Sequence, residues 1–322
     1  MYFRDKGVVL ISILLIVLLL SSVAVLFGNK YLLSLKRAQY LEFQTVSLNS
    51  FRNIESLSQK IIEDEFRFNS KKLSKNNPII NNEIFLNIND AQIRGKIVDA
   101  SNCFNINSIV YKENNNYLEN TKSAEAFRRI MILYDIENNV IEEMIDQIID
   151  WIDKDSNPRT YGLEDYYYSG PLHSPREYSA MRLFVSVDEL KSIPAVKEVN
   201  WNIFEKNFCS VPAKEDLSIN INTLLNEDKY LISAFFPNMD LNDAEYLIDS
   251  IPVQGFENID NLKKAFPNLD FSSPYGRIKF NSNLFELHTT IQHNNFSASS
   301  RSTIIYSTNK NSYIISRIYN GI

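Results

Sequence analysis

Five acidic or amide side chains are concentrated in one short segment in the middle of the chain. They are Asp153, Asp155, Asn157, Glu164 and Asp165. Counted from Asp153, the first four occupy positions 1, 3, 5 and 12 of an EF-hand-type loop, whose oxygen ligands suit a hard cation. Position 6 is Pro158 instead of glycine, so the loop must turn differently around an ion. The spacing predicts a calcium site in which Asp165 can join. The alternative is a solvated acidic loop whose side chains bond to their own backbone.

The other polar residues form no pattern typical of an active site. His173, His288 and His293 are far apart in the sequence, and the chain has no nucleophile elbow, P-loop or zinc-binding motif. Asp146 and Asp150 share one face of a predicted helix, and we interpret this as a solvated face. We therefore predict no catalytic residue and no enzymatic activity.

Charge and composition argue against nucleic-acid-binding and anionic-membrane-binding proteins. The net charge is −6, whereas a general nucleic-acid or anionic-membrane binder would carry basic patches. Residues 237–240 stand where a helix-hairpin-helix module would contact phosphate, but they are acidic and lack glycine. We expect no nucleic-acid partner. A length of 322 residues, 44% of them hydrophobic, is enough for about two folded domains.

An apolar segment at the N-terminus predicts that the protein is anchored in a membrane. Residues 8–27 carry no charge and would form a helix roughly 30 Å long, which matches the hydrocarbon core of a bilayer. Arg4 and Lys6 precede it, so residues 1–7 are expected in the cytoplasm. The basic residues beyond the segment, which weaken this assignment, are Lys30, Lys36 and Arg37. We predict a single-pass membrane protein whose C-terminal bulk lies on the side of the membrane opposite residues 1–7.

The start of this segment resembles a type IV prepilin leader. A short basic sequence ends in Lys6-Gly7 and is followed directly by Val8-Val9-Leu10-Ile11. In that family a prepilin peptidase cleaves after the glycine and the new N-terminus is methylated. The resemblance implies cleavage between Gly7 and Val8 and methylation of Val8. It also implies a single-pass protein of the bacterial inner membrane with its C-terminal bulk in the periplasm. The alternative is an ordinary signal anchor with a glycine at its edge.

Helical periodicity continues beyond the membrane segment. Apolar residues recur at three- and four-residue spacing from Phe51 through Ile54 to Ile62, and the helix is expected to end near residue 68. A long helix that is apolar all round in its first half and amphipathic in its second is typical of a pilin spine. An anchored enzyme would more often have a flexible linker here.

Cys103 and Cys209 are the two cysteines of the chain. In an oxidising periplasm they are expected to form a disulfide at the base of the segment that they flank. Two free thiols are the alternative.

The rest of the chain divides into strands at both flanks and helices between them. Strand-like alternation appears at 84–98, 277–292, 302–308 and 312–319, whereas about 105–270 is predicted to be helical. Residues 104–109 and 219–224 form a weak internal repeat, and each introduces a pair of short helices. We expect one sheet built from both flanks, interrupted by a large helical insertion.

Several segments, in order, resemble type II secretion protein K, a family of minor pseudopilins. Besides the leader, they are 99–107, 151–155, 162–167, 218–223 and 255–256. The likeness covers nearly the whole chain. It departs after residue 172, where the family has a Ser-Glu-Leu-Arg run and this chain has Ser179-Ala180-Met181-Arg182, which makes ligands from that stretch doubtful.

The resemblance implies an α+β, pilin-like fold. A long N-terminal transmembrane and amphipathic helix would pack on an antiparallel sheet, and a large all-α insertion would form two small SAM-like or helix-hairpin-helix-like subdomains. The expected divisions are a leader (1–7), a transmembrane segment (8–27), the spine helix and first strands (28–104), two helical subdomains (105–212 and 213–272) and the last strands (273–322). The resemblance also implies bound calcium and a disulfide. The implied partners are the prepilin peptidase and minor pseudopilins I, J and H.

One residue relates this resemblance to a position in the pseudopilus. The fifth residue of ordinary mature pilins is a glutamate that pairs with a neighbour's N-terminal amine, and the fifth residue counted from Val8 is Ser12. An unpaired carboxylate inside the membrane costs several kcal/mol, so a subunit with no neighbour beyond it benefits from lacking one. Ser12 therefore suits a tip subunit that initiates and caps the pseudopilus during export of folded proteins.

Two rival interpretations remain open. One is a minor pilin of a type IV pilus or competence system, which would share the leader and the spine. The other is a signal-anchored periplasmic hydrolase that uses the acidic loop as a metal site, and it predicts that turnover is lost in Asp153→Asn.

Overall fold

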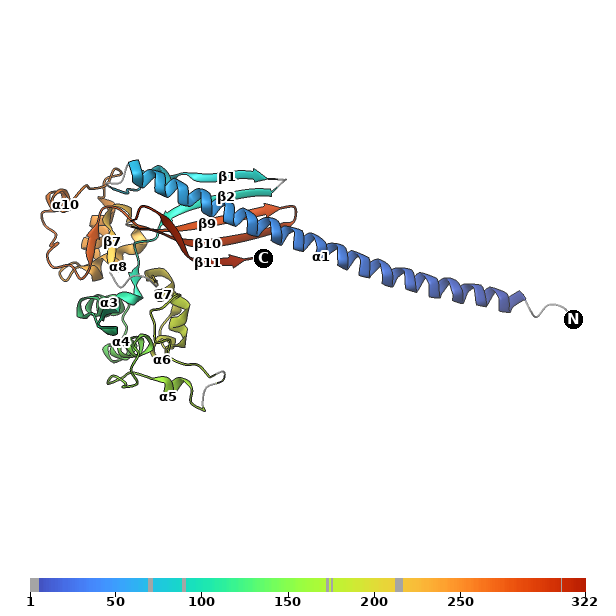
Figure 1. Ribbon diagram of the computed structural model, residues 1–322, viewed down its shortest axis with the longest axis horizontal. Helices are drawn as coiled ribbons and strands as arrows, with labels where there is room; N and C mark the ends of the chain where they lie inside the picture. The colour runs from blue at the N-terminus through green and yellow to red at the C-terminus, as the bar shows by residue number, and fades with distance from the viewer. Residues whose placement is uncertain are drawn as a thin grey trace.

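A computed structural model of the chain describes residues 6–68, 72–88, 91–171, 174, 176–211, 217–307 and 309–322. Figure 1 shows a long helix, α1 (Lys6–Phe68), that projects from a head made of a sheet and short helices. The N-terminal half of α1 extends far beyond the head, and the C-terminus lies on the sheet.

The 63 residues of α1 form one uninterrupted helix. Its first part is apolar all round and exposed, and it is long and apolar enough to cross a membrane. Its second part is amphipathic, and Phe51, Ile54 and Ile62 on one face are completely buried. The predicted spine is confirmed, and no linker separates the membrane segment from the folded head.

Five antiparallel strands cover the buried face of α1, in the order β1-β2-β9-β10-β11. Their bounds are Glu83–Ile88, Ala91–Asp99, Leu284–His293, Phe296–Tyr306 and Ser312–Asn320, and a short helix α2 (Pro78–Asn81) precedes them. Alternate residues such as Ile93, Leu287 and Ile291 face the helix, as the strand periodicity requires. The prediction of one sheet from both flanks is confirmed: the insertion leaves at Asp99 and returns at Leu284, on two neighbouring strands.

The insertion has a hydrophobic core separate from that between α1 and the sheet. Its first part contains β3 (Phe104–Asn105), β4 (Val110–Glu113), β5 (Asn116–Glu119), α3 (Thr121–Leu133), α4 (Asn138–Ile152), α5 (Asp165–Tyr168), α6 (Pro194–Lys197), α7 (Trp201–Asn207) and β6 (Phe208–Cys209). Its second part contains β7 (Ser218–Asn220), α8 (Lys229–Phe235), α9 (Leu241–Asp249), α10 (Ile259–Ala265) and β8 (Arg277–Lys279). Short 3-10 helices span Ile106–Ile109, Val187–Ser192, Ile221–Thr223 and Asn226–Asp228. The two parts share one core, and α3 packs against α8.

The internal repeat of the sequence corresponds to a repeated pair of hydrogen bonds, each made by one buried asparagine side chain to the backbone of a distant residue. Asn107 is buried, accepts the backbone N–H of Phe184 at 2.8 Å and donates to its carbonyl at 2.9 Å. In the second part, Asn222 makes the same pair of bonds with Phe256, at 2.6 and 2.8 Å. Gly255 (φ +68°) approaches Asn222 so closely that a Cβ there would lie 2.6 Å from its Cγ. Each asparagine therefore ties the start of its own part to a distant loop.

The structure differs from the expected elements in several places. The short strands β6 and β7 lie in the range expected to be helical, and β10 begins at Phe296 although its strand was expected from residue 302. Residues 110–119, expected to be helical, form the antiparallel hairpin β4–β5. The strand expected over 277–292 is divided: Arg277–Lys279 pairs in parallel with β7, and only Leu284–His293 joins the sheet. Strand periodicity does not specify the partner strand, so the expected boundary at residue 273 falls before the end of the inserted part.

Candidate functional site

The acidic loop begins where α4 ends. The apolar face of α4, including Ile145, Ile148 and Ile152, is buried in the core of the insertion and fixes the helix. Asp153 is its C-cap, with an extended backbone conformation (φ −70°, ψ 178°), so the chain turns away from the helix at the first predicted ligand. The loop returns to the core at Glu164, which is the N-cap of α5.

Three carboxylates converge in this loop. One oxygen each from Asp153, Asp155 and Glu164 lies within 4.8 Å of the others. Glu164 is 2% exposed and Asp153 is 9% exposed, although both are acids. In the described part of the chain, neither Asp153 Oδ1 nor Glu164 Oε1 has a hydrogen-bond partner. Buried carboxylate oxygens without a donor are costly, and a hard cation bound between them would remove that cost.

Electrostatics at the cluster favour an added positive charge. Burial, followed by repulsion from Asp155 and Asp150, raises the pKa of Asp153 to about 7. Burial and repulsion from the same aspartates and Asp153 raise the pKa of Glu164 to about 7. Burial also raises the pKa of Asp150 to about 6. The ionised carboxylates repel one another, and a divalent cation would compensate this repulsion.

Arg159 holds the loop against α4 and β5. Its Nε donates to Asp146 Oδ1 at 2.7 Å, its Nη2 pairs with Glu119, and its backbone N–H donates to Asp150 Oδ2 at 3.1 Å. Asp150 is completely buried, so the interpretation of Asp146 and Asp150 as a solvated face is wrong. The four-residue spacing was visible in the sequence, but it did not show that the loop folds back over this face. A Cβ at Gly162 would lie 1.8 Å from Asp150 Oδ2, so only glycine fits there.

The two other predicted ligands have different surroundings. The backbone N–H of Asn157 donates to Asp155 Oδ1 at 2.8 Å, which shapes the turn, and Asn157 itself is exposed. Asp165 Oδ1 accepts from the backbone N–H and the hydroxyl of Ser179, at 2.8 and 2.7 Å. Asp165 is thus engaged in ordering the segment that follows α5, and it is not one of the three converging carboxylates.

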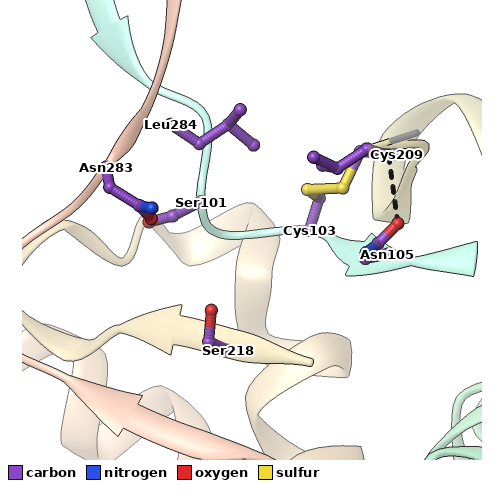
Figure 2. A pocket seen from close by; sticks show the side chains of 8 residues that line it. Ser101, Cys103, Asn105, Cys209, Ser218, Asn283 and Leu284 are labelled. Carbon is purple, nitrogen blue, oxygen red and sulfur yellow. Dashed lines mark hydrogen bonds between the residues drawn. A yellow bond between two sulfur atoms is a disulfide. The ribbon is translucent and has the colours of Figure 1, made fainter. Parts of the chain in front are cut away.

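Cys103 and Cys209 form the predicted disulfide, which is confirmed (Figure 2). Their Cα atoms are 5.7 Å apart, and the bond lies at the ends of the paired strands β3 and β6. Beside it, Asn105 Oδ1 accepts the backbone N–H of Val211 at 3.1 Å. The disulfide closes the first helical part where the chain enters and leaves it.

The residues predicted for processing and tip position lie at the start of α1. Met1–Asp5 of the predicted leader are outside the described residues, whereas the backbone of Gly7 and Val8 is helical. Ser12 lies one turn further along, on the exposed apolar stretch. The structure does not test cleavage or methylation, which remain predictions.

Histidines do not contribute to the acidic cluster in the described part of the chain. His288 is on β9 and its Nε2 is 2.6 Å from Glu286 Oε2, on the face of the sheet away from α1. His293 ends β9, and His173 is outside the described residues. The cluster has the chemistry of a binding site for a hard cation. It shows no nucleophile next to a base.

Comparison with known proteins gives a consistent result. The family model described as type II secretion system (T2SS), protein K, matches residues 102–213, which contain the acidic loop and the disulfide. The type II secretion system protein K of Aeromonas hydrophila is 24% identical over 271 residues, which cover 82% of this chain and 81% of that protein. The protein K of Pectobacterium carotovorum is 26% identical and covers 81% of this chain and 80% of that protein.

The fold matches a solved structure over almost its full length. In the crystal structure of the GspK-GspI-GspJ complex from the type 2 secretion system of enterotoxigenic Escherichia coli, one chain superimposes with a TM-score of 0.75. The match covers 88% of this chain and 99% of that chain, at 20% sequence identity. The pilin-like arrangement of helix, sheet and large insertion is therefore a known architecture.

Proposed function

We propose that this chain is a member of the type II secretion system protein K family and that it is the minor pseudopilin at the tip of the pseudopilus. There it would help to initiate and cap the filament that exports folded proteins across the outer membrane. The comparisons support type II secretion over a type IV pilus or competence system, because the matching proteins belong to secretion systems.

The position of the insertion is the observation that carries the tip assignment. The chain leaves the sheet at Asp99, the end of β2 that is remote from the membrane segment, and the insertion lies at that end of the sheet (Figure 1). Subunits of a helical filament stack along their spine helices, so a bulky domain at the far end obstructs a subunit docking above. The architecture therefore suits the last subunit of the filament.

Ser12 supports the same position. The membrane segment of α1 contains no carboxylate, and Ser12 stands where ordinary mature pilins carry the glutamate that pairs with a neighbour's N-terminal amine. A subunit at the tip has no neighbour beyond it, and a buried unpaired charge would be costly. Ser12 avoids that cost.

The proposed partners are the minor pseudopilins I and J of the same secretion system. The solved complex contains a K chain together with I and J, and the K chain has the same fold as this protein. The exposed apolar stretch of α1 offers a surface for their spine helices. Pseudopilin H and the prepilin peptidase are further predicted partners.

Calcium is the proposed ligand of the acidic loop. Asp153, Asp155 and Glu164 would hold it, because one oxygen of each converges on the others. In the described chain, Asp153 Oδ1 and Glu164 Oε1 also lack a hydrogen-bond partner. The ion would neutralise the repulsion between the carboxylates and fix the loop on α4. Asn157 and Asp165 are the remaining candidates for the ligand set.

We further propose that the head lies in the periplasm and that the leader is removed between Gly7 and Val8. The experiment is an intact-mass measurement on the membrane-extracted protein, with and without the host's prepilin peptidase. Loss of Met1–Gly7 that depends on the peptidase, with one methyl group on Val8, supports the pseudopilin assignment. A full-length chain, or one cut after the apolar segment, would overturn it.

A further inference from the structure

Unpaired buried polar groups are concentrated around the acidic loop. In the described part of the chain, ten buried side-chain oxygen or nitrogen atoms lack a hydrogen-bond partner, and four of them belong to residues 151–168. Two are the acceptors Asp153 Oδ1 and Glu164 Oε1. The other two can donate, and they are Trp151 Nε1 and the hydroxyl of Tyr168. Because buried polar groups are normally paired, this concentration in one short segment points to a ligand shell that they share.

Tyr168 lies at the end of the short helix that Glu164 begins. Glu164 is the N-cap of α5 and Tyr168 is its last residue, so the two side chains are separated by about one helical turn. Tyr168 is 2% exposed. Its ring contacts those of Trp151 and Tyr167 edge to face, with centroids 5.0 and 5.4 Å apart. These contacts fix the ring, and therefore the direction in which its hydroxyl points.

The hydroxyl of Tyr168 belongs to the surroundings of the acidic cluster. Burial raises the pKa of this phenol, and the charges of Tyr167, Asp150 and Glu164 raise it further. The phenol is therefore close enough to these carboxylates to interact with them, and it keeps its proton. A neutral phenol hydroxyl can donate one hydrogen bond and accept another.

The three converging carboxylates leave part of a calcium shell to other ligands. Calcium binds about 6–8 oxygens, whereas one oxygen each from Asp153, Asp155 and Glu164 converges here. Asp165 Oδ1 is already bonded to Ser179. Water commonly fills the remaining positions of a calcium site. A water on a cation directs its hydrogens away from the ion, so inside a protein it requires an acceptor behind it.

We propose that the cation keeps at least one water between α4 and α5, and that the Tyr168 hydroxyl positions this water by accepting a hydrogen bond from it. The inference rests on the proposed calcium site and adds to it a positioning residue that does not touch the ion. Groups that orient metal ligands from behind commonly change metal affinity by about 10–100-fold. Trp151 Nε1 is the second donor of the same shell.

Tyr134 provides the matched comparison for Tyr168. It belongs to the same insertion, and its ring stacks on Tyr230 with centroids 4.3 Å apart. Its hydroxyl accepts a hydrogen bond from Asn207 Nδ2 at 2.9 Å, so this hydroxyl is paired without an ion. Removing the hydroxyl of Tyr134 breaks an existing bond, whereas removing that of Tyr168 relieves an unpaired group in the calcium-free protein. The two changes should therefore act in opposite ways.

The test compares Tyr168→Phe, Tyr134→Phe and the wild-type full chain in detergent. Calcium affinity is measured by calorimetric titration, and the midpoint of thermal unfolding is measured in chelator. We expect Tyr168→Phe to weaken calcium binding about tenfold without lowering the midpoint in chelator. We expect Tyr134→Phe to keep the wild-type affinity and to lower the midpoint.

A second measurement counts the water directly. Terbium replaces calcium at oxygen-rich sites, and its luminescence decays more slowly in D2O than in H2O by an amount that gives the number of bound waters. We expect at least one water on terbium bound to the wild-type chain. A bound ion without water would overturn the inference.

The remaining outcomes separate this inference from the site on which it rests. Equal calcium affinity in Tyr168→Phe and the wild type would overturn the positioning role and leave the calcium site in place. A lower midpoint of Tyr168→Phe in chelator would assign Tyr168 to packing alone and would overturn the role as well. A wild-type chain that binds neither ion would overturn the calcium site itself, together with this inference.

Discussion

The carboxylate of Glu55 on α1 accepts a hydrogen bond from Nε–H of Arg317 on the edge strand β11, and both carboxylate oxygens lie 3.0 Å from this nitrogen. Glu55 is 2% exposed and also accepts the hydroxyl of Ser302 at 2.6 Å. Further along the helix, Glu63 accepts the backbone N–H of Ser312 at 2.7 Å, at the start of the same strand. Polar contacts thus bind β10 and β11 to the spine, in addition to the apolar core.

Removing the Glu55 carboxylate is expected to destabilise the head. In Glu55→Ala, Arg317 and Ser302 lose their shared acceptor, and hydrogen bonds to charged groups contribute about 1.5–3 kcal/mol each. Arg317 is 43% exposed and can find water, so we expect a total loss of about 2 kcal/mol. Thermal unfolding of the full chain in detergent measures it. Arg52→Ala, at an exposed site on the same helix, is the control and should change stability by less than about 0.5 kcal/mol.

Calcium is expected to stabilise the insertion. At a free concentration of 100 times the dissociation constant, a ligand that binds only the folded state adds about 2.7 kcal/mol. Calorimetric titration with calcium and thermal unfolding with and without chelator measure binding and stabilisation. Asp153→Asn and Glu164→Gln should abolish both effects. Asp188→Asn, an exposed acid elsewhere in the insertion, should retain them. If calcium does not change the thermal stability of the chain, the proposed calcium site is contradicted.

The raised pKa values in the acidic loop predict that the stability of the calcium-free protein falls as the pH rises. Folding raises the pKa of Asp150 to about 6 and those of Asp153 and Glu164 to about 7, so the folded state binds protons more tightly than the unfolded chain does. Without calcium, the stability from these groups is complete below about pH 4 and is lost as the pH rises through 6–7. Calcium binds the ionised oxygens, so its stabilising effect should increase from about pH 5 to pH 8. Unfolding curves at each pH test the sign, and a constant effect would contradict it.

The disulfide is expected to matter most for the first helical part. The bond joins residues separated by 106 positions, and a crosslink that closes a loop of about that size stabilises by about 4–5 kcal/mol in the chain-entropy model. In Cys103→Ser/Cys209→Ser, amide hydrogen exchange should increase in α3 and α4 and remain low in β2 and β9. The two regions have separate cores, which is why the effects should differ. Equal increases in both regions would show that they unfold together.

The repeated asparagines allow a paired test. Asn107→Ala removes the partner of the backbone N–H and carbonyl of Phe184, and Asn222→Ala does the same for Phe256. Both sites are completely buried, so each change leaves polar groups unsatisfied and should cost about 2–3 kcal/mol. Asn202→Ala, at an exposed position, is the control. Thermal unfolding measures whether the two asparagines contribute equally to stability. A loss of less than about 1 kcal/mol in the free energy of unfolding would contradict the role assigned to them.

The sequence was sufficient to predict those elements that depend only on the residues of one continuous segment. The absence of charge over residues 8–27 and the helical periodicity after Phe51 require a long anchored helix, because both patterns refer to one continuous segment. The alternation near 84–98 and 277–292 was sufficient to predict strands, since side chains of a strand alternate between its two faces. The spacing of Asp153, Asp155 and Glu164 identified three carboxylates that do converge.

Only the tertiary structure decided which distant groups meet. The sequence placed Asp146 and Asp150 on one helix face but did not show that Arg159 covers that face, because a loop fold is set by contacts made on both of its sides. It suggested strands from residue 277 onwards but could not distinguish the short partner of β7 from the sheet strand that follows. Periodicity records which side of an element is buried. The identity of the partner depends on packing across the whole chain, and this is what brings Glu55 to Arg317 and the β9–β10 turn to Lys36.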